Sequence, residues 1–143
     1  MFAPSQDQVR RFFCEAWAKH QAGQVLTPLE LQATDWIGQH AEYHDDLADV
    51  EAAVKATYQV EDGRTNPFLH LSMHLSITEQ VSIDQPPGIR NAVQRLAMRL
   101  GSLHEAQHQV MEALGEMVWT AQRSGQPFDG AAYIDRVLAL ASR

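Results

Sequence analysis

The sequence of 143 residues contains a single cysteine, Cys14, which limits how the fold can be held together. One cysteine cannot form a disulfide within the chain, so a hydrophobic core must stabilise the fold, and a reducing compartment is expected. No apolar run approaches the roughly 18 residues of a membrane-spanning helix. The opening segment MFAPSQDQVRRFF also lacks the apolar stretch of a signal peptide. We therefore expect a cytoplasmic protein that does not enter a membrane.

Positive charge is scarce as well. The 11 lysines and arginines face 18 acidic residues, and the resulting formal net charge of -7 repels phosphate backbones. Arg90, Arg95 and Arg99 form only a small local basic patch. These charges argue against nucleic acid as a partner. If the chain has a macromolecular partner, we expect another protein or a second copy of the chain.

Common catalytic motifs are missing from the sequence. The chain has no glycine-rich phosphate loop, no dinucleotide-binding fingerprint and no G-x-S-x-G nucleophile motif. Ferritin-like diiron proteins use paired E-x-x-H motifs, and here only one is present, from Glu105 to His108. A diiron site of that kind is therefore not expected.

Helix start and stop signals divide most of the chain into α-helices, with little that predicts a strand. Three capping boxes each predict a helix start: Ser5 with Gln8, Thr27 with Glu30, and Ser102 with Glu105. Asn66 and Pro67 begin a further helix, Asp129 caps the last one, and Asp45 or Asp46 is predicted to cap a weaker helix that ends near Tyr58.

These signals predict the fold class. The expected helices cover residues 6–22, 28–40, 46–58, 67–82, 89–100, 103–124 and 130–140, separated mainly by a loop at 59–66 and a turn at 84–88. The sequence therefore predicts one all-α domain over residues 1–143, a bundle of five to seven helices.

Six of the seven histidines form three H-x-x-x-H pairs, namely His40 with His44, His70 with His74, and His104 with His108. On a helix, side chains four residues apart lie on one face, so each pair can offer two imidazoles to one ion. Such nitrogen ligands suit zinc, nickel or iron. The pairs therefore indicate a divalent metal as the cofactor.

The His70/His74 pair has the most favourable position. Its stripe on the helix is bordered by Ile77 and Val81, which predicts that both imidazoles face the interior. The alternative is a pair of core histidines that hydrogen-bond to backbone carbonyls, or to each other through water.

The third pair is spelled HEAQH, in residues 104–108. In zincins this motif supplies two zinc-binding histidines and a glutamate that activates water. Glu105 is also explained as the acid of the capping box that Ser102 begins. Glu112 follows His108 at a helical interval, so it is the preferred carboxylate ligand, and Glu105 and Glu112 are both candidate general bases.

Chain topology connects two of the pairs. If the helix 89–100 returns between them, the helices 67–82 and 103–124 run parallel, with their first turns at the same end. The predicted metal site then joins four histidines with one carboxylate, and a fifth histidine is a further candidate: His70, His74, His104, His108, Glu112 and His44. If instead the helices 89–100 and 103–124 are continuous, a weaker site of two or three ligands remains.

Three other residues have simpler interpretations. His40 and His20 are expected at helix ends or on the surface, where a cation suits the C-terminal end of a helix. Cys14 lies among Phe12, Phe13 and Trp17, which predicts a small core residue rather than a nucleophile.

The segments TNPFLHLSMHL, EQVSIDQPPGIR, HEAQH and LGEMVW, with the opening FAPSQDQVRRFF, resemble a family of small bacterial proteins catalogued only as a domain of unknown function. The resemblance covers nearly the whole chain and supports a single domain. It implies no activity, cofactor or catalytic residue.

Two classes of function are compatible with these patterns. The first is a metal-dependent hydrolase, in which a histidine-bound ion activates water and Glu105 or Glu112 acts as general base. The second is a non-catalytic structural or protein-interaction domain with core histidines. An open coordination position favours the first, whereas a closed four-ligand shell or no bound metal favours the second.

Overall fold

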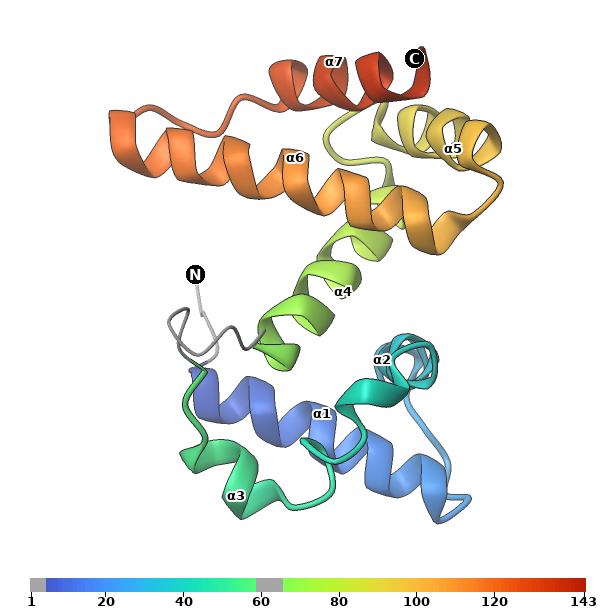
Figure 1. The fold of residues 1–143 in the computed structure, drawn as a ribbon, viewed down its shortest axis with the longest axis vertical. Coiled ribbons are helices and arrows are strands. Elements are labelled where there is room, and N and C mark those ends of the chain that lie inside the picture. Colours follow the sequence, from blue (N-terminus) through green and yellow to red (C-terminus); the bar gives the residue numbers. More distant parts are fainter. Residues whose placement is uncertain (1–4, 59–65) are drawn as a thin grey trace. The chain divides into compact units, whose positions relative to one another are not determined.

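A computed structural model describes residues 5–58 and 66–143, and the chain divides into two compact units, Met1–Leu75 and Ser76–Arg143 (Figure 1). Within the described ranges, the chain forms seven α-helices and one short 3-10 helix, without a strand. The predicted all-α fold of five to seven helices is confirmed. The single domain over residues 1–143 stays a prediction, and the predicted loop 59–66 lies outside the described residues except for Asn66.

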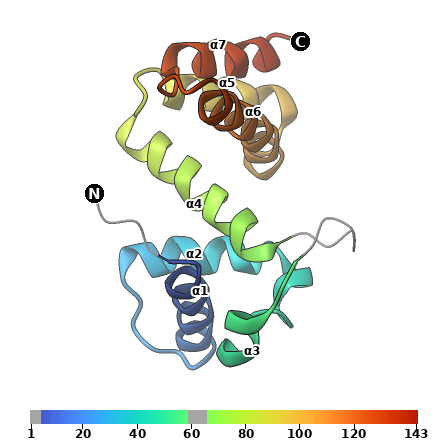
Figure 2. The same cartoon turned by 90° about the vertical axis from the view of Figure 1, so that its left-hand side faces the viewer.

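The first unit contains α1 (Gln6–Gln21), α2 (Pro28–Gly38), η1 (Ala41–Tyr43), α3 (Val50–Lys55) and the first half of α4 (Pro67–Ile83). Helix α1 packs against both α2 and α3 (Figure 2). The core of this unit consists of large buried side chains from three of these helices: Phe13, Trp17, Trp36, Ile37, Phe68 and Leu71.

The predicted capping boxes of α1 and α2 are confirmed. The Ser5 hydroxyl accepts a hydrogen bond from the Gln8 amide at 3.1 Å, and the Gln8 side chain accepts one from the Ser5 amide at 2.8 Å. Thr27 and Glu30 form the same reciprocal pair at 3.2 and 2.9 Å. Each pair satisfies two amides that the first helical turn leaves without a partner, which explains why both helices begin where the sequence indicates.

The predicted start of α3 is wrong. Helix α3 begins at Val50, and its cap is Asp49, whose carboxylate accepts from the amides of Glu51 at 3.0 Å and Ala52 at 3.3 Å. Residues 44–47 form a turn instead of a helix, and this turn places Leu47 in the core at 3% exposure. Asp46 has a different role, because its carboxylate accepts from the Tyr58 hydroxyl at 3.2 Å.

The second unit contains the last part of α4 with α5 (Ile89–Leu100), α6 (Leu103–Ser124) and α7 (Gly130–Ala141), and α5 packs against both α6 and α7. Gly101 has a φ of 72° and separates α5 from α6, so these two helices are not continuous. Two side-chain hydrogen bonds fix the end of α4 in this unit: Gln107 donates to the Thr78 hydroxyl at 3.2 Å, and the Tyr133 hydroxyl donates to the Gln80 side chain at 2.8 Å.

The turn at 84–88 connects α4 to α5 as predicted. Its first residue is Asp84, with a φ of 54°, and the Asp84 carboxylate accepts from the amides of Arg90 at 3.0 Å and Gly88 at 3.2 Å. The Arg90 amide is the main cause of a lowered pKa of Asp84, with a smaller contribution from Gly88. The carboxylate therefore stays ionised and holds the start of α5 in place.

Among the helices of the described ranges, none combines the length and apolar composition needed to cross a bilayer.

Candidate metal centre

His70 and His74 lie in the first two turns of α4, whose start is fixed by Asn66 and Pro67. The Asn66 side-chain oxygen accepts from the amides of Phe68 at 3.0 Å and Leu69 at 3.2 Å. Helical spacing then brings the Nε2 atoms of His70 and His74 to 3.1 Å from each other. Nitrogens that bind one tetrahedral ion at about 2.1 Å lie about 3.4 Å apart, so this pair is close to the spacing that a metal needs.

The same distance also suits a direct hydrogen bond, in which one ring donates its Nε2 proton to the other. The structure thus confirms the predicted interior position of His74, which has 0% exposure, while His70 is half-buried. Geometry within this pair is compatible with both predicted interpretations, a metal ligand pair and a hydrogen-bonded core pair.

His40 is the third histidine of this cluster in the first unit. It lies just beyond the end of α2, as expected for a residue at a helix end, but it is buried and not on the surface. It is 2% exposed, and its ring centroid lies 4.9 Å from that of His70 and 4.9 Å from that of His74. Its Nδ1 donates to the Trp36 carbonyl at 2.7 Å. A carbonyl can only accept, so Nδ1 carries a proton, and in the neutral ring Nε2 is the nitrogen that could bind a metal.

A hydrogen bond of this kind is common in metal sites. A ligating histidine usually donates its other ring N–H to a carbonyl or carboxylate, which fixes the tautomer and the ring orientation. His40 already has that arrangement, because it follows α2 directly and reaches back to a carbonyl of the last turn. The three histidines His40, His70 and His74 are called the first-unit cluster below.

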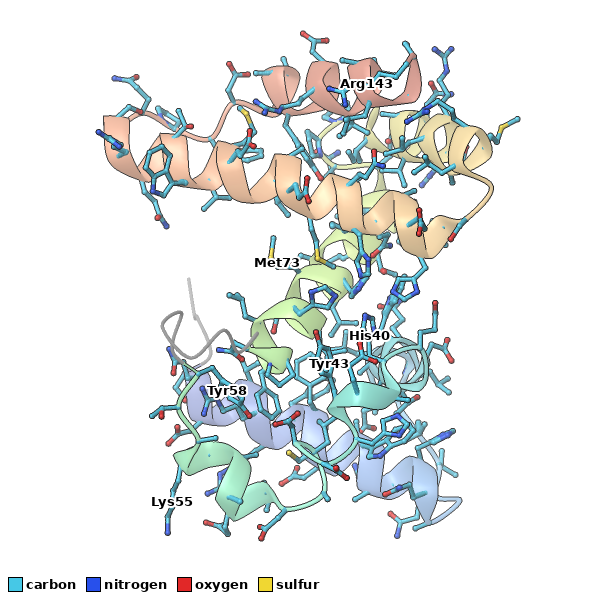
Figure 3. All side chains as sticks on the ribbon, in the orientation of Figure 1. His40, Tyr43, Lys55, Tyr58, Met73 and Arg143 are labelled. Atoms are coloured by element: carbon cyan, nitrogen blue, oxygen red, sulfur yellow. The ribbon has the colours of Figure 1, made fainter. Side chains whose placement is uncertain are left out.

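Two aromatic residues hold the first-unit cluster in place. Trp36 stacks on His74 with ring centroids 4.0 Å apart and an interplanar angle of 14°. Tyr43 stacks on His40 with ring centroids 5.2 Å apart and an interplanar angle of 2°, and its edge meets His70 at 5.8 Å. Figure 3 labels His40 and Tyr43. Burial, followed by the charges of Glu42 and Asp46, raises the pKa of Tyr43, so its hydroxyl stays protonated. The cluster therefore lies in a packed aromatic environment.

His44 has a different environment, although it is the sequence partner of His40. The chain leaves the helical conformation at His40, with φ of -128° and ψ of 67°, so spacing by four no longer directs the two rings to one side. His44 packs against Trp17, with ring centroids 4.7 Å apart, and its Nε2 donates to the Ile37 carbonyl at 3.1 Å. A ligand role for His44 would therefore use its Nδ1 atom, on a ring that packs against Trp17.

The second unit contains the HEAQH pair at the start of α6. Ser102 caps the helix by accepting from the Glu105 amide at 3.1 Å. His104 and His108 are half-buried, and their ring centroids lie 4.4 Å apart. These two imidazoles form a second potential ligand pair. Glu105, between them in the sequence, is exposed.

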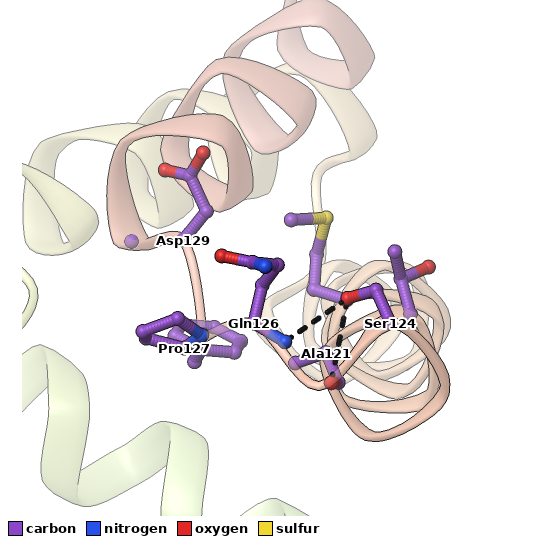
Figure 4. Close-up of a pocket in the computed structure, with 9 residues that line it drawn as sticks. Ala121, Ser124, Gln126, Pro127 and Asp129 are labelled. Carbon is purple, nitrogen blue, oxygen red and sulfur yellow. Dashed lines mark hydrogen bonds between the residues drawn. The ribbon is translucent and has the colours of Figure 1, made fainter.

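Glu112 is exposed and lines a groove of about 390 Å³ between α6 and α7. Glu116 lines the same groove and pairs with Arg136 of α7, and Arg143 is a second basic residue there. Glu112 thus has arginine side chains as neighbours within this groove. A larger pocket of about 650 Å³ lies at the other end of these helices (Figure 4), where the Ser124 hydroxyl donates to Ala121 and accepts from Gln126.

Comparison with models of known families assigns the chain to one family. The model of the family described as Domain of unknown function (DUF1841) matches residues 5–139. The protein belongs to this family. No curated protein and no solved structure matched the chain. The family description states no activity, so function must be argued from the histidines.

Proposed function

We propose that the protein binds one divalent metal ion, zinc, nickel or iron, through its clustered histidines, and that the ion stabilises the fold. The observation that supports this most directly is the 3.1 Å distance between the Nε2 atoms of His70 and His74, with His40 beside them. An all-imidazole set favours these metals over magnesium or calcium, which prefer oxygen ligands.

The proposed ligand set has contributions from both units. His40, His70 and His74 supply the first-unit ligands, and the HEAQH pair supplies His104 and His108. Imidazole nitrogens of His40, His74, His104 and His108 would make a complete four-coordinate shell. In this proposal His70 either orients His74 or takes the place of one of these four ligands. Glu112 and His44 are additional candidate ligands outside the four-histidine set.

The test is metal content and affinity. Protein prepared without a histidine tag or a chelating resin is analysed for metals, and the metal-free form is titrated with zinc and nickel by calorimetry. One ion per chain is expected. His74→Gln keeps a polar side chain of similar length but removes the imidazole ligand, so it should abolish tight binding, and His108→Gln should weaken it by at least about 10-fold.

The matched control is His20→Gln. His20 is exposed and stacks on Trp17 with ring centroids 5.1 Å apart, so its loss removes an imidazole without changing the proposed shell. Absence of stoichiometric binding by either metal, or equal affinity of His74→Gln and the unchanged protein, would reject the proposal in favour of hydrogen-bonded core histidines.

A hydrolase is the second candidate function, and one observation favours it. The half-buried pair His104 and His108 has the exposed Glu105 beside it in the HEAQH motif, with Glu112 further along α6. In a hydrolase, one coordination position would hold water, and Glu105 or Glu112 would remove its proton. Azide added to the cobalt-loaded protein should displace such a water and change the visible spectrum. An unchanged spectrum would indicate a closed shell and a non-catalytic role.

We also propose a cytoplasmic location, because a chain with one buried cysteine has no use for an oxidising compartment. Association with another protein or with a second copy of the chain remains a prediction.

A further inference from the structure

Arg10 of α1 is a charged side chain that the proposed metal site does not use. It is 7% exposed, and its Nη1 donates to the carbonyls of Ala53 at 2.8 Å and Ala56 at 2.7 Å. Its guanidinium carbon also lies 5.5 Å from the centre of the Tyr58 ring and 5.4 Å from that of Phe68. The guanidinium is therefore held in one orientation at the C-terminal end of α3.

This orientation leaves one edge of the guanidinium for a ligand. Both of these hydrogen bonds use Nη1, whereas the parallel N–H bonds of Nε and Nη2 form the edge that binds carboxylate or phosphate oxygens in pairs. Buried charges are normally compensated by an opposite charge. Within the described ranges, the partners of Arg10 are carbonyls and aromatic rings, and none of them is a carboxylate.

Arg10 lines a pocket of about 510 Å³ in the first unit. Its described lining residues include two cations and no anion: Gln6, Arg10, Val54, Lys55, Ala56, Thr57, Tyr58 and Asn66. Two of these lining residues, Lys55 and Tyr58, are labelled in Figure 3. The described lining is therefore positively charged and suits an anion, although the whole chain has a formal net charge of -7.

Asn66 adds two features that favour an anion. Its side-chain oxygen caps α4, which leaves the two N–H bonds of its amide group as donors. It also marks the N-terminus of the 17-residue helix α4, where the helix dipole contributes a partial positive charge. Thus a buried guanidinium, an ammonium group, an amide donor and a helix N-terminus all line or border one pocket.

We propose that this pocket binds a phosphate group, as inorganic phosphate or as part of a small phosphate monoester. Two positive side chains match the two negative charges of phosphate near neutral pH, and the Nε–Nη2 edge of Arg10 matches a pair of its oxygens. The site lies within the first unit and is independent of the proposed metal.

The test uses the full chain with phosphate and glycerol phosphate as probes, and with acetate as a carboxylate probe at equal ionic strength. Saturable binding is measured by calorimetry and by the rise in melting temperature. Asn66→Asp keeps the oxygen that caps α4 but replaces the amide donor with a negative charge, so it should weaken phosphate binding at least about 10-fold. Lys55→Gln, at an exposed position, should weaken it about 3-fold.

Two control variants test whether phosphate binds in this pocket rather than elsewhere on the protein. Arg11→Gln removes one exposed positive charge from α1 outside the pocket and should leave phosphate affinity unchanged. His74→Gln should also leave it unchanged, which distinguishes the pocket from phosphate bound to a metal ion. The proposal is overturned if neither phosphate probe binds saturably, if acetate binds as tightly as phosphate, or if Asn66→Asp binds phosphate as well as the unchanged protein.

Discussion

The hydrogen bond from His40 to the Trp36 carbonyl determines what this residue can do. Because Nδ1 donates to this carbonyl, Nε2 is the ring nitrogen that a metal would bind. His74 gains a comparable restriction from the ring of Trp36, 4.0 Å away. Folding itself thus orders these two side chains, so a metal would bind to rings that are already oriented and would not lose free energy to their conformational entropy.

Cys14 gives a prediction at the same scale. Burial, followed by the charges of Glu15 and Asp49, raises the pKa of its thiol from 9.0 to about 11. Only the thiolate reacts with alkylating agents, so the native protein at pH 8 should react at least about 100-fold more slowly than the unfolded protein. Iodoacetamide labelling followed by mass spectrometry, with and without guanidinium, measures this ratio. Equal rates would show that the core around α1 is open.

Glu30 gives a pH-dependent prediction. The Thr27 amide, followed by the Lys19 ammonium at 3.0 Å, lowers the pKa of Glu30. A carboxylate with a lowered pKa stabilises the fold above its unfolded-state pKa, and this contribution is lost as pH falls through its folded-state pKa. Glu30→Gln should therefore lower the urea midpoint at pH 7 and change it little in strong acid.

The control for Glu30 is Glu51→Gln. Glu51 pairs with Arg11 at 3.2 Å with a side chain that is 65% exposed, so its loss should have a smaller effect at pH 7. If Glu30→Gln were as stable as the unchanged protein at pH 7, the Lys19 pair would contribute nothing measurable.

Single residues also show why only part of the candidate site could be predicted from the sequence. Helical spacing correctly placed His70 beside His74 and His104 beside His108, because each pair lies within a regular helix. It failed for His40 and His44, because the helix ends at Gly38 and the following backbone turns the two rings apart. The pairing of His40 with His70 and His74 depends on packing between helices, which local periodicity does not contain.

Helices could be predicted where the capping chemistry is local. Six of the predicted starts agree with the structure within a residue, because Ser5, Thr27, Asn66, Ser102 and Asp129 each bond to amides two or three residues ahead and Gly88 precedes α5. The start of α3 was wrong because this region offers three aspartates as caps, and the choice among them follows from the burial of Leu47.

The cap of α3 is directly testable. Asp49→Ala removes the carboxylate that accepts from Glu51 and Ala52, and should lower the free energy of unfolding by about 1 kcal/mol. Asp45→Ala, at an exposed position that the sequence offered as an alternative cap, should change it by less than about 0.5 kcal/mol. Urea denaturation followed by circular dichroism measures both. A larger loss of unfolding free energy for Asp45→Ala than for Asp49→Ala would instead support Asp45 as the cap of the helix.

For the whole molecule, the proposed ion should link metal binding to the stability of both units. A ligand that binds only the folded state stabilises it by about 2.7 kcal/mol at one hundred times its dissociation constant. If the proposed set is correct, zinc should slow amide hydrogen exchange around residues 70–74 and around residues 104–108, and a chelator should reverse both effects. His108→Gln should reduce the protection in each segment, whereas His20→Gln should preserve it. Protection by zinc that is confined to the first unit, and unchanged in His108→Gln, would limit the ligands to His40, His70 and His74 and leave the HEAQH pair without a role in metal binding.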